Sequence, residues 1–347
     1  MNYGDTSLSS KPLFHRAMLE SGAATSRAVY PYNATLHKIQ FDSFVKEAGC
    51  SNLAEDEIMP CLRRKPIKTI AQASVNIFNN YEDSDCWPFQ PVIDGKTIKI
   101  APIKAWETGH WAKIPILTGF NTNDGAMFVD PKMDKSSEFL DFFHALIPAL
   151  EDSDLKKLDN LYPDPLKYPN SPYKETRPIA VGSQYKRVDA AYGQFAYVCP
   201  VRQTAHLASA GQNQPVYLYH WALNKTVSRG ASHGDQLEYE VHNPNVHGIS
   251  EAQDKIAGYR HAYLTSFITT GDPNAVGGKY ADRPFWKPFE PANSDGKRSS
   301  ENIMVFGKGN DERAGGNNVG VPAQVVDDVW SAEECKFWSE RTILWES

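Results

Sequence analysis

The sequence lacks the features of a membrane-spanning or nucleic-acid-binding protein. Its 347 residues contain no continuous apolar run of about 18, the length that a bilayer-spanning helix needs. Its 36 Lys and Arg residues are outnumbered by 42 Asp and Glu residues, which gives a net charge of -6, and no basic block occurs. A nucleic-acid partner or an anionic membrane surface requires clustered positive charge. These absences leave small-molecule chemistry or protein contacts as the classes of function.

The N-terminal stretch MNYGDTSLSSKPLFHR also lacks the apolar core of a secretory signal. Taken alone, this predicts a protein that is not exported. Two features indicate the opposite: Cys50 and Cys61 flank a short polar loop, and Asn33 and Asn224 each begin an N-glycosylation sequon. Sequons often arise by chance, and five cysteines are also compatible with a reduced cytosolic protein of this length. These residues therefore leave the compartment open.

The sequence does contain enough apolar residues for a sizeable core, with 41% hydrophobic and 12% aromatic residues. Strands are predicted in RAMLESGAA, at 114–117 and at 214–223, and helices at 34–50, 136–150, 187–211 and 252–271. Strands separated by long helices predict an α/β architecture with a largely parallel sheet. The tail 275–320, rich in Gly, Asn, Asp and Pro, is predicted to be a surface excursion. No linker composition marks a second domain.

Ser232 is the centre of the single match to G-x-S-x-G, the pattern of a serine-hydrolase nucleophile elbow. An elbow needs a strand that runs directly into the first glycine and a helix that leaves from the last. Here the preceding strand is predicted to end near Leu223, and the segment after Gly234 is broken at Pro244. We therefore interpret Ser232 as a polar loop residue, with an independent nucleophile as the least favoured alternative.

His233 and Asp124 are the better candidates for catalysis. Each follows a predicted buried strand, and open α/β sheets place their chemistry at such strand ends. A carboxylate beside the imidazole would fix its tautomer and stabilise the imidazolium that forms during acyl transfer. The alternatives are an ordinary surface histidine and a turn-forming Asn-Asp-Gly sequence. The residues alone favour the turn for Asp124.

Several segments, taken in order, resemble the type-B carboxylesterase and lipase family, which includes cholinesterase-like proteins and fungal secreted esterases. They cover nearly the whole chain: LFHRAMLESGA, AGCSNLAEDEIMPCLR, WPFQPVIDG, IPILTGFNTNDGAMF, VYLYHW, GASHGDQLEYEV, and finally FITTGDPN, WKPF and CKFW. A single piece of this series is a weak signal, whereas the ordered series is specific.

The resemblance implies roles for individual residues. His233 matches the general base, and Asp124 matches the triad acid, where most members have Glu and some have Asp. Ser21, in LESGA, matches a serine that lies near the acid and is not the nucleophile. Cys50 and Cys61 match a conserved disulfide, which favours an oxidising compartment and secretion. Cys86, Cys199 and Cys335 receive no assignment.

The resemblance also implies an α/β-hydrolase fold of which residues 1–347 form the C-terminal portion of a single domain. In the family, the N-terminal strands, the Gly-rich oxyanion loop and the nucleophile elbow precede LFHRAMLESG. We therefore expect the nucleophile to lie outside this chain and the isolated chain to be inactive.

The function implied is hydrolysis of a small-molecule or lipid ester, without a metal or organic cofactor. The histidines and acidic residues show no spacing of the H-E-x-x-H kind. The alternative from another class is a non-catalytic, cholinesterase-like interaction module. The ester preferred and the oligomeric state are not predicted.

Overall fold

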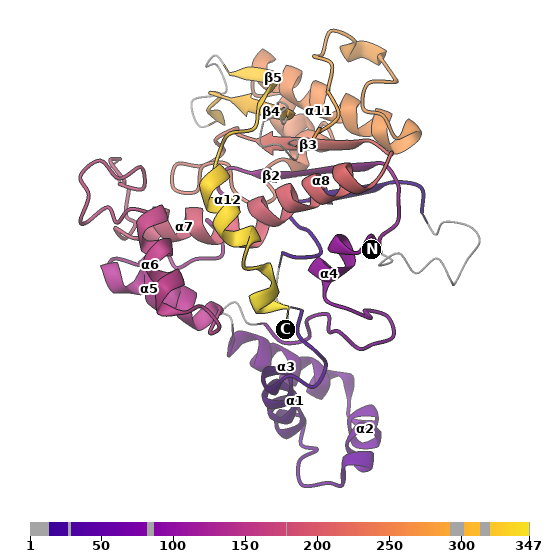
Figure 1. Ribbon diagram of the computed structural model, residues 1–347, viewed down its shortest axis with the longest axis vertical. Coiled ribbons are helices and arrows are strands. Elements are labelled where there is room, and N and C mark those ends of the chain that lie inside the picture. Colours follow the sequence, from indigo (N-terminus) through magenta and orange to yellow (C-terminus); the bar gives the residue numbers. More distant parts are fainter. Residues whose placement is uncertain are drawn as a thin grey trace.

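The computed structural model describes residues 14–26, 29–81, 87–177, 179–291, 302–312 and 320–346. Its centre is a sheet in the order β1 (Ala17–Glu20), β2 (Ile116–Asn121), β3 (Val216–Trp221), β4 (Asn302–Lys308) and β5 (Val321–Asp327). The strands β1 to β4 are parallel, and β5 runs antiparallel to β4 (Figure 1). The predicted α/β architecture with a largely parallel sheet is therefore confirmed.

Helices surround this sheet and extend from it (Figure 1). In chain order they are α1 (Thr35–Glu47), α2 (Glu55–Arg64), α3 (Ile67–Asn79), α4 (Pro102–Glu107), α5 (Ser136–Leu146), α6 (Asp152–Leu161), α7 (Tyr185–Gly193), the π-helix η3 (Gln194–Val198), α8 (Cys199–Gly211), α9 (Leu237–Glu240), α10 (Pro244–His247), α11 (Glu251–Thr270), the 3₁₀-helix η4 (Gly278–Tyr280), α12 (Ala332–Ser339) and the 3₁₀-helix η6 (Thr342–Trp345).

The sheet separates two hydrophobic cores. Successive strand residues point to opposite faces, so Leu218 packs into the core that contains α8 residues, whereas Tyr217 and Tyr219 pack into the core that contains α11 residues. Strands covered on both faces need apolar side chains at nearly every position. This explains the continuous apolar sequence of β3.

The sequence from Gly119 to Gly125, rich in Asn, Thr and Gly, predicts a loop after the strand at 114–117. The start of this loop is wrong, because β2 continues to Asn121. Pairing with the neighbouring strands also continues through this glycine. Glu20 of β1 lies opposite Gly119 itself, and Trp221 of β3 lies opposite Asn121, two residues further on. A Cβ at position 119 would lie 2.1 Å from the ring of Tyr219. The glycine therefore makes room for an aromatic side chain within the sheet instead of starting a turn.

The prediction of a surface excursion over 275–320 is wrong for its strand β4. This strand lies inside the sheet, between β3 and β5, and the side chains of residues 303–306 are buried. Those four residues, IMVF, are a continuous apolar run of the kind that a buried strand needs. The polar and glycine-rich sequence on either side concealed this signal.

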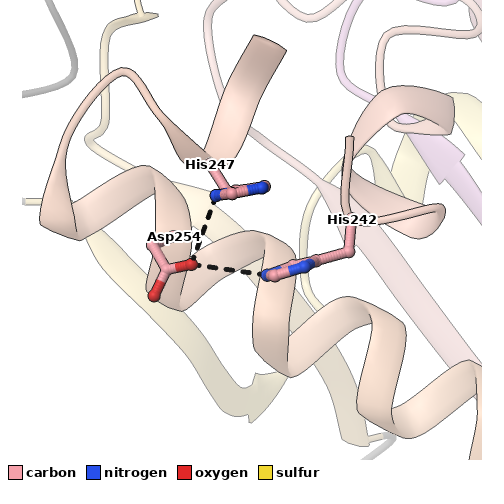
Figure 2. A group of neighbouring side chains, drawn as sticks. All are labelled: His242, His247 and Asp254. Atoms are coloured by element: carbon pink, nitrogen blue, oxygen red, sulfur yellow. Dashed lines mark ion pairs between the residues drawn. The ribbon is translucent and has the colours of Figure 1, made fainter. Parts of the chain in front are cut away.

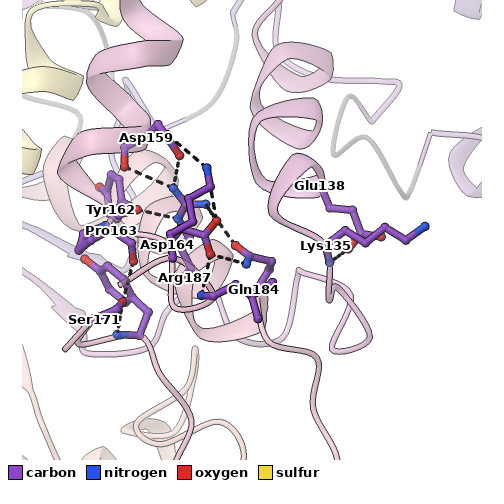
Figure 3. Close-up of polar contacts among 12 residues, drawn as sticks. Lys135, Glu138, Asp159, Tyr162, Pro163, Asp164, Ser171, Gln184 and Arg187 are labelled. Atoms are coloured by element: carbon purple, nitrogen blue, oxygen red, sulfur yellow. Dashed lines mark hydrogen bonds and ion pairs between the residues drawn. The ribbon is translucent and has the colours of Figure 1, made fainter. Parts of the chain in front are cut away.

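A buried arginine joins the α5–α6 lobe to α7 (Figure 3). The guanidinium of Arg187 pairs with Asp159 at 2.5 Å, donates to the carbonyl oxygen of Tyr162 at 2.6 Å, and lies 3.9 Å from a carboxylate oxygen of Asp164. Gln184 donates to the other oxygen of Asp164 at 2.8 Å. This network replaces the water that a buried charge loses.

Asp164 is itself buried, which raises its pKa, but hydrogen bonds outweigh that effect. Donors at Ser136, Gln184 and the Leu166 amide, together with the charge of Arg187, hold the pKa of this carboxyl at about 2. Asp164 is therefore an ionised, structural carboxylate. Its charge gives Arg187 a permanent partner within the lobe.

Two disulfides lie within the described residues. Cys50–Cys61 closes the loop between α1 and α2, beside the small separate core of α1, α2 and α3, and Cys199–Cys335 joins α8 to α12. The second pairing gives partners to two cysteines that the sequence left unassigned, whereas Cys86 lies outside the described residues. No helix in the described part of the chain has the length and apolar character required to cross a bilayer.

Candidate active site

The loops that follow β2 and β3 meet at the carboxyl edge of the sheet. The Asn123 amide donates to the carbonyl oxygen of Ala231 at 2.9 Å, and an isolated parallel bridge pairs Asn123 with Ser232. The next residue in each loop is Asp124 or His233. Strand pairing thus extends into the loops and brings together two side chains that are 109 residues apart in the chain.

Asp124 and His233 are in direct hydrogen-bond contact. Nδ1 of His233 lies 2.9 Å from Oδ1 of Asp124. The other carboxylate oxygen accepts from the Ser21 hydroxyl at 2.9 Å and from the Asn121 amide at 2.7 Å. Asp124 is fully buried, whereas the His233 side chain is 31% exposed. The carboxylate is therefore held in one orientation, and the imidazole has one edge open to a ligand.

Gly125 permits the backbone behind Asp124 to touch α7. A Cβ at this position would lie 2.2 Å from the carbonyl oxygen of Asp189 and 2.7 Å from the amide nitrogen of Gly193. Such distances exclude any side chain without movement of α7. The glycine of Asn-Asp-Gly thus serves a close helix contact, which composition alone does not distinguish from a turn.

Asp189 is a second buried carboxyl beside the site, and it was not predicted from the sequence. The side-chain amide of Asn123 donates to it at 3.0 Å. Burial raises the pKa of Asp189 to about 7, and the nearby charge of Asp124 acts in the same direction. A single acidic residue within a helix gives no sequence pattern that would indicate its burial next to Asp124. Its proximity to Asp124 emerges only from the packing of α7 under the loop.

Aromatic side chains flank the imidazole of His233. The Tyr197 ring centroid lies 4.7 Å from that of His233, and the Phe128 ring meets it edge to face at 5.3 Å. Tyr197 belongs to the π-helix η3, a rare geometry that is frequent at functional sites. The two rings give the site an apolar wall. Neither ring was identified from the sequence.

Ser232 is not placed as an elbow serine would be. Strand β3 ends at Trp221, and the helix that follows, α9, begins at Leu237 and contains four residues. The Ser232 amide donates to the Asp235 carboxylate at 2.7 Å, and its carbonyl accepts from Asn121 at 2.6 Å. Within the described ranges, no serine hydroxyl is hydrogen-bonded to His233.

A buried ion cluster lies behind the site, next to Ser21. Arg260 is fully buried and pairs with Glu20, at the end of β1, at 2.7 Å and with Glu240 at 2.5 Å. Its guanidinium also lies 3.8 Å from the ring centroid of Tyr219. Burial raises the pKa of Glu20 to about 7, although the charge of Arg260 opposes this. The cluster fixes the strand end that carries Ser21.

The chain matches the model of the carboxylesterase family over residues 5–319. It belongs to that family. It is 34% identical over 292 residues to secreted lipase 4 of Gibberella zeae, a match that covers 83% of this chain and 50% of that protein. It is 25% identical over 284 residues to lipase 2 of Geotrichum candidum, covering 78% of this chain and 47% of that protein.

Neuroligin-3 of Homo sapiens is also similar, with 26% identity over 290 residues, 76% of this chain and 32% of that protein. Among solved structures, Aspergillus niger EstA superposes with a TM-score of 0.73 at 22% identity, covering 100% of this chain and 61% of that one. This likeness supports the α/β-hydrolase fold that the sequence predicted. The chain spans about half the length of the curated fungal lipases it matches.

Proposed function

We propose that this chain carries the acid and the base of an ester hydrolase, with Asp124 as the acid and His233 as the general base. The observation that carries the proposal is the 2.9 Å contact between Asp124 Oδ1 and His233 Nδ1. In this arrangement the buried carboxylate accepts a hydrogen bond from Nδ1–H of His233, so the lone pair of the neutral imidazole is on Nε2 and can accept from a hydroxyl group.

The chemistry follows from this tautomer. His233 takes the proton of a serine hydroxyl as that oxygen attacks the ester carbonyl, and then returns the proton to the leaving alkoxide. Asp124 stabilises the imidazolium formed between these two transfers. Ser21 acts as a positioning residue, because its hydroxyl occupies the Asp124 oxygen that does not face His233.

The nucleophile and the main oxyanion donors, in this proposal, come from polypeptide outside these 347 residues. Two observations support it: no described serine is hydrogen-bonded to His233, and the fungal lipases are about twice as long as the matched region. The chain is then the C-terminal portion of one hydrolase domain. On its own it has no triad-dependent turnover.

The substrate class in this proposal is a small-molecule or lipid ester with an apolar acyl or alcohol group. The rings of Tyr197 and Phe128 beside His233 favour an apolar group on the substrate, because they offer an apolar surface against which such a group can pack. Secretion is part of the same proposal. The two disulfides, the name of the Gibberella zeae relative, and the sequons at Asn33 and Asn224 support it.

The test supplies the nucleophile and the oxyanion donors from another protein. The N-terminal half of the Gibberella zeae lipase is fused to this chain, and the chimera is assayed with a short p-nitrophenyl ester and a fluorophosphonate probe. We expect both hydrolysis and labelling of a serine in the added half, with both lost in His233→Ala. Labelling of a serine in the unfused chain would overturn the external nucleophile.

A non-catalytic interaction module is the second candidate, and the similarity to neuroligin-3 favours it. The two candidates differ in the role of His233. An interaction module predicts a folded chimera in which His233→Ala changes neither labelling nor hydrolysis. The pairing of buried Asp124 with the partly exposed His233 favours the hydrolase, since an interaction surface has no need of that pair.

A further inference from the structure

Two histidines and an aspartate meet on the segment that follows the His233 loop. His242 lies in the turn after α9, His247 is the last residue of α10, and Asp254 lies in the first turn of α11. Figure 2 shows both imidazoles presenting a ring nitrogen to the same oxygen of Asp254. The distances are 3.4 Å from Nε2 of His242 and 3.7 Å from Nδ1 of His247.

The two separations from the Asp254 oxygen, 3.4 Å and 3.7 Å, are close to those between ligands of a tetrahedral metal ion. Bonds of about 2.0–2.2 Å from zinc to nitrogen or oxygen place neighbouring ligand atoms about 3.3–3.6 Å apart. All three ligand atoms lie within 4.8 Å of one another. The imidazole rings are stacked, with centroids 4.5 Å apart and planes 8° apart, and one nitrogen of each ring faces the Asp254 oxygen. A small rotation of the rings converges the three atoms on one ion.

A third histidine lies close to the cluster but is already engaged. His261 is adjacent to His242, with ring centroids 6.0 Å apart, but its Nδ1 is occupied by the carbonyl oxygen of Glu240 at 2.7 Å. The three side chains are only partly buried, so solvent reaches them. Three protein ligands and a water complete four-coordinate zinc.

We propose that His242, His247 and Asp254 bind one divalent transition-metal ion, with Zn²⁺ as the preferred metal. Imidazole nitrogen suits Zn²⁺, Cu²⁺ and Ni²⁺, whereas Mg²⁺ and Ca²⁺ prefer all-oxygen sites. No metal was predicted from the sequence, since its histidines and acidic residues show no spacing of the H-E-x-x-H kind; the three residues here form H-x₄-H-x₆-D. The site does not include His233, and its occupation does not depend on the proposed hydrolase activity.

The bound ion ties the turn after α9 to the start of α11. Gln236 lies between His233 and this turn, and its side-chain oxygen accepts from the side-chain amide of Asn121 at 2.8 Å. The backbone amide of Asn121 donates to the Asp124 carboxylate. The role of the ion is therefore structural: it restrains the polypeptide that follows the His233 loop. Anything that binds the native state alone raises its stability.

The experiment titrates the chelator-stripped full chain with Zn²⁺ by calorimetry. We expect one ion per chain, no competition from Mg²⁺ or Ca²⁺, and a rise in Tm on addition of Zn²⁺. His247→Gln and Asp254→Asn should each weaken binding more than about ten-fold, since loss of even an outer partner of a ligand costs about 10–100-fold. Co²⁺ should show the intense visible absorption of a four-coordinate site.

Matched variants separate this site from adventitious binding. His144→Gln removes an exposed histidine on α5, and His233→Gln removes the imidazole beside Asp124. Both should bind Zn²⁺ as the parent chain does. Equal affinity in the parent chain, His247→Gln and Asp254→Asn, or loss of binding in His233→Gln, would overturn the proposal. Circular dichroism without metal verifies that every variant is folded.

Tyr280 supplies a further test, because its hydroxyl lies 3.2 Å from Nε2 of His242, the nitrogen assigned to the metal. That hydrogen bond and the metal compete for one lone pair. Tyr280→Phe keeps the ring that packs against Gly258 and removes the competitor. We expect tighter Zn²⁺ binding in this variant. Weaker binding would make Tyr280 a ligand and overturn the three-residue set.

Discussion

His233 and Asp124 are joined by a hydrogen bond of 2.9 Å between Nδ1 and Oδ1, although 109 residues separate them in the chain. The pair depends on neighbouring parallel strands, because β2 and β3 carry the two loops to the same edge of the sheet. Two further donors, Ser21 and the Asn121 amide, hold the other carboxylate oxygen. The protein's own side chains and backbone therefore set this geometry.

This contact predicts the tautomer of His233. In the neutral imidazole the proton should reside on Nδ1, because an ionised carboxylate only accepts. Asp124→Asn presents an amide that can donate, so we expect the proton to move to Nε2. Nitrogen-15 NMR of histidine-labelled chain distinguishes the two forms, with exposed His144 as the internal control. The same tautomer in both proteins would contradict the assigned hydrogen bond.

In the chimera the same substitution should lower kcat by roughly 10⁴-fold, the effect known when a triad acid is converted to its amide. Ser21→Ala leaves the carboxylate ionised and removes one of its three hydrogen-bond partners. We therefore expect a much smaller loss of kcat, with the Nδ1 proton retained. A loss in Ser21→Ala as large as in Asp124→Asn would contradict a positioning role for this serine.

Asp189 predicts a pH-dependent stability. Burial raises its folded pKa to about 7, whereas an unfolded Asp titrates near about 3.9. The folded state therefore binds the proton more tightly, and this contribution to stability falls as pH rises from about 4 to about 7, by up to about 1.4 kcal/mol per pH unit. Above the folded pKa the contribution is constant.

Asp189→Asn removes this titration while its side-chain oxygen can still accept from Asn123. The free energy of unfolding of the variant minus that of the parent should grow between pH 4 and pH 7 and then level off. Urea unfolding at several pH values measures this difference, and the other titrating groups, including Glu20, cancel in it. A difference that does not change with pH would mean that Asp189 is ionised in the folded chain.

The parts of the site that could be predicted are those with short sequence patterns. His233, Asp124 and Ser21 each lie in a segment that resembles its counterpart in the family, and the structure brings all three into one hydrogen-bonded group. Asp189 and Tyr197 could not be found this way. They reach the site because α7 and the π-helix pack under the loop, a relationship that involves residues distant in sequence.

The fold was predictable where strand and helix patterns were clean, as in β3 and α11. The error over β4 has a physical cause. This strand contains seven residues, and the polar, glycine-rich sequence on both sides of it gives the whole region 275–320 the composition of a surface loop. The boundary error at Gly119 has another. A glycine normally predicts a turn, but here the ring of Tyr219 occupies the space that a side chain at position 119 would need.

Arg187 predicts a large loss of stability on substitution. Arg187→Met keeps an apolar stem of similar reach but removes the buried guanidinium from Asp159 and Asp164. Buried Asp164 then retains the ion pair with the exposed Lys167 at 3.7 Å. Breaking a buried pair in this way costs about 3–5 kcal/mol. Lys38→Met is the matched control, because the Lys38–Asp42 pair is exposed at 75% and 61%, and its loss should cost no more than about 0.5 kcal/mol. Urea unfolding of both variants compares the two costs.

The two disulfides should contribute unequally to stability. Cys199–Cys335 spans 136 residues and Cys50–Cys61 spans 11. In the chain-entropy account, cross-linking restricts the unfolded chain more when the loop is longer, by about 5 kcal/mol for the first and about 3 kcal/mol for the second. Replacing each pair by alanines, one pair at a time, should therefore lower the urea midpoint more for Cys199 and Cys335.

Local packing affects the same comparison. Cys199 and Cys335 are both buried beside the large core, so their replacement also removes sulfur atoms from packed positions. Reduction of the intact cysteines separates this effect from the cross-link, because reduction breaks the bond and keeps the sulfurs. Both samples are compared after reduction, so that neither keeps the Cys50–Cys61 bond. If the reduced parent chain and the reduced Cys199→Ala, Cys335→Ala variant unfold at the same urea concentration, the cross-link accounts for the loss. A larger effect from the Cys50 and Cys61 pair would contradict the dependence on loop length.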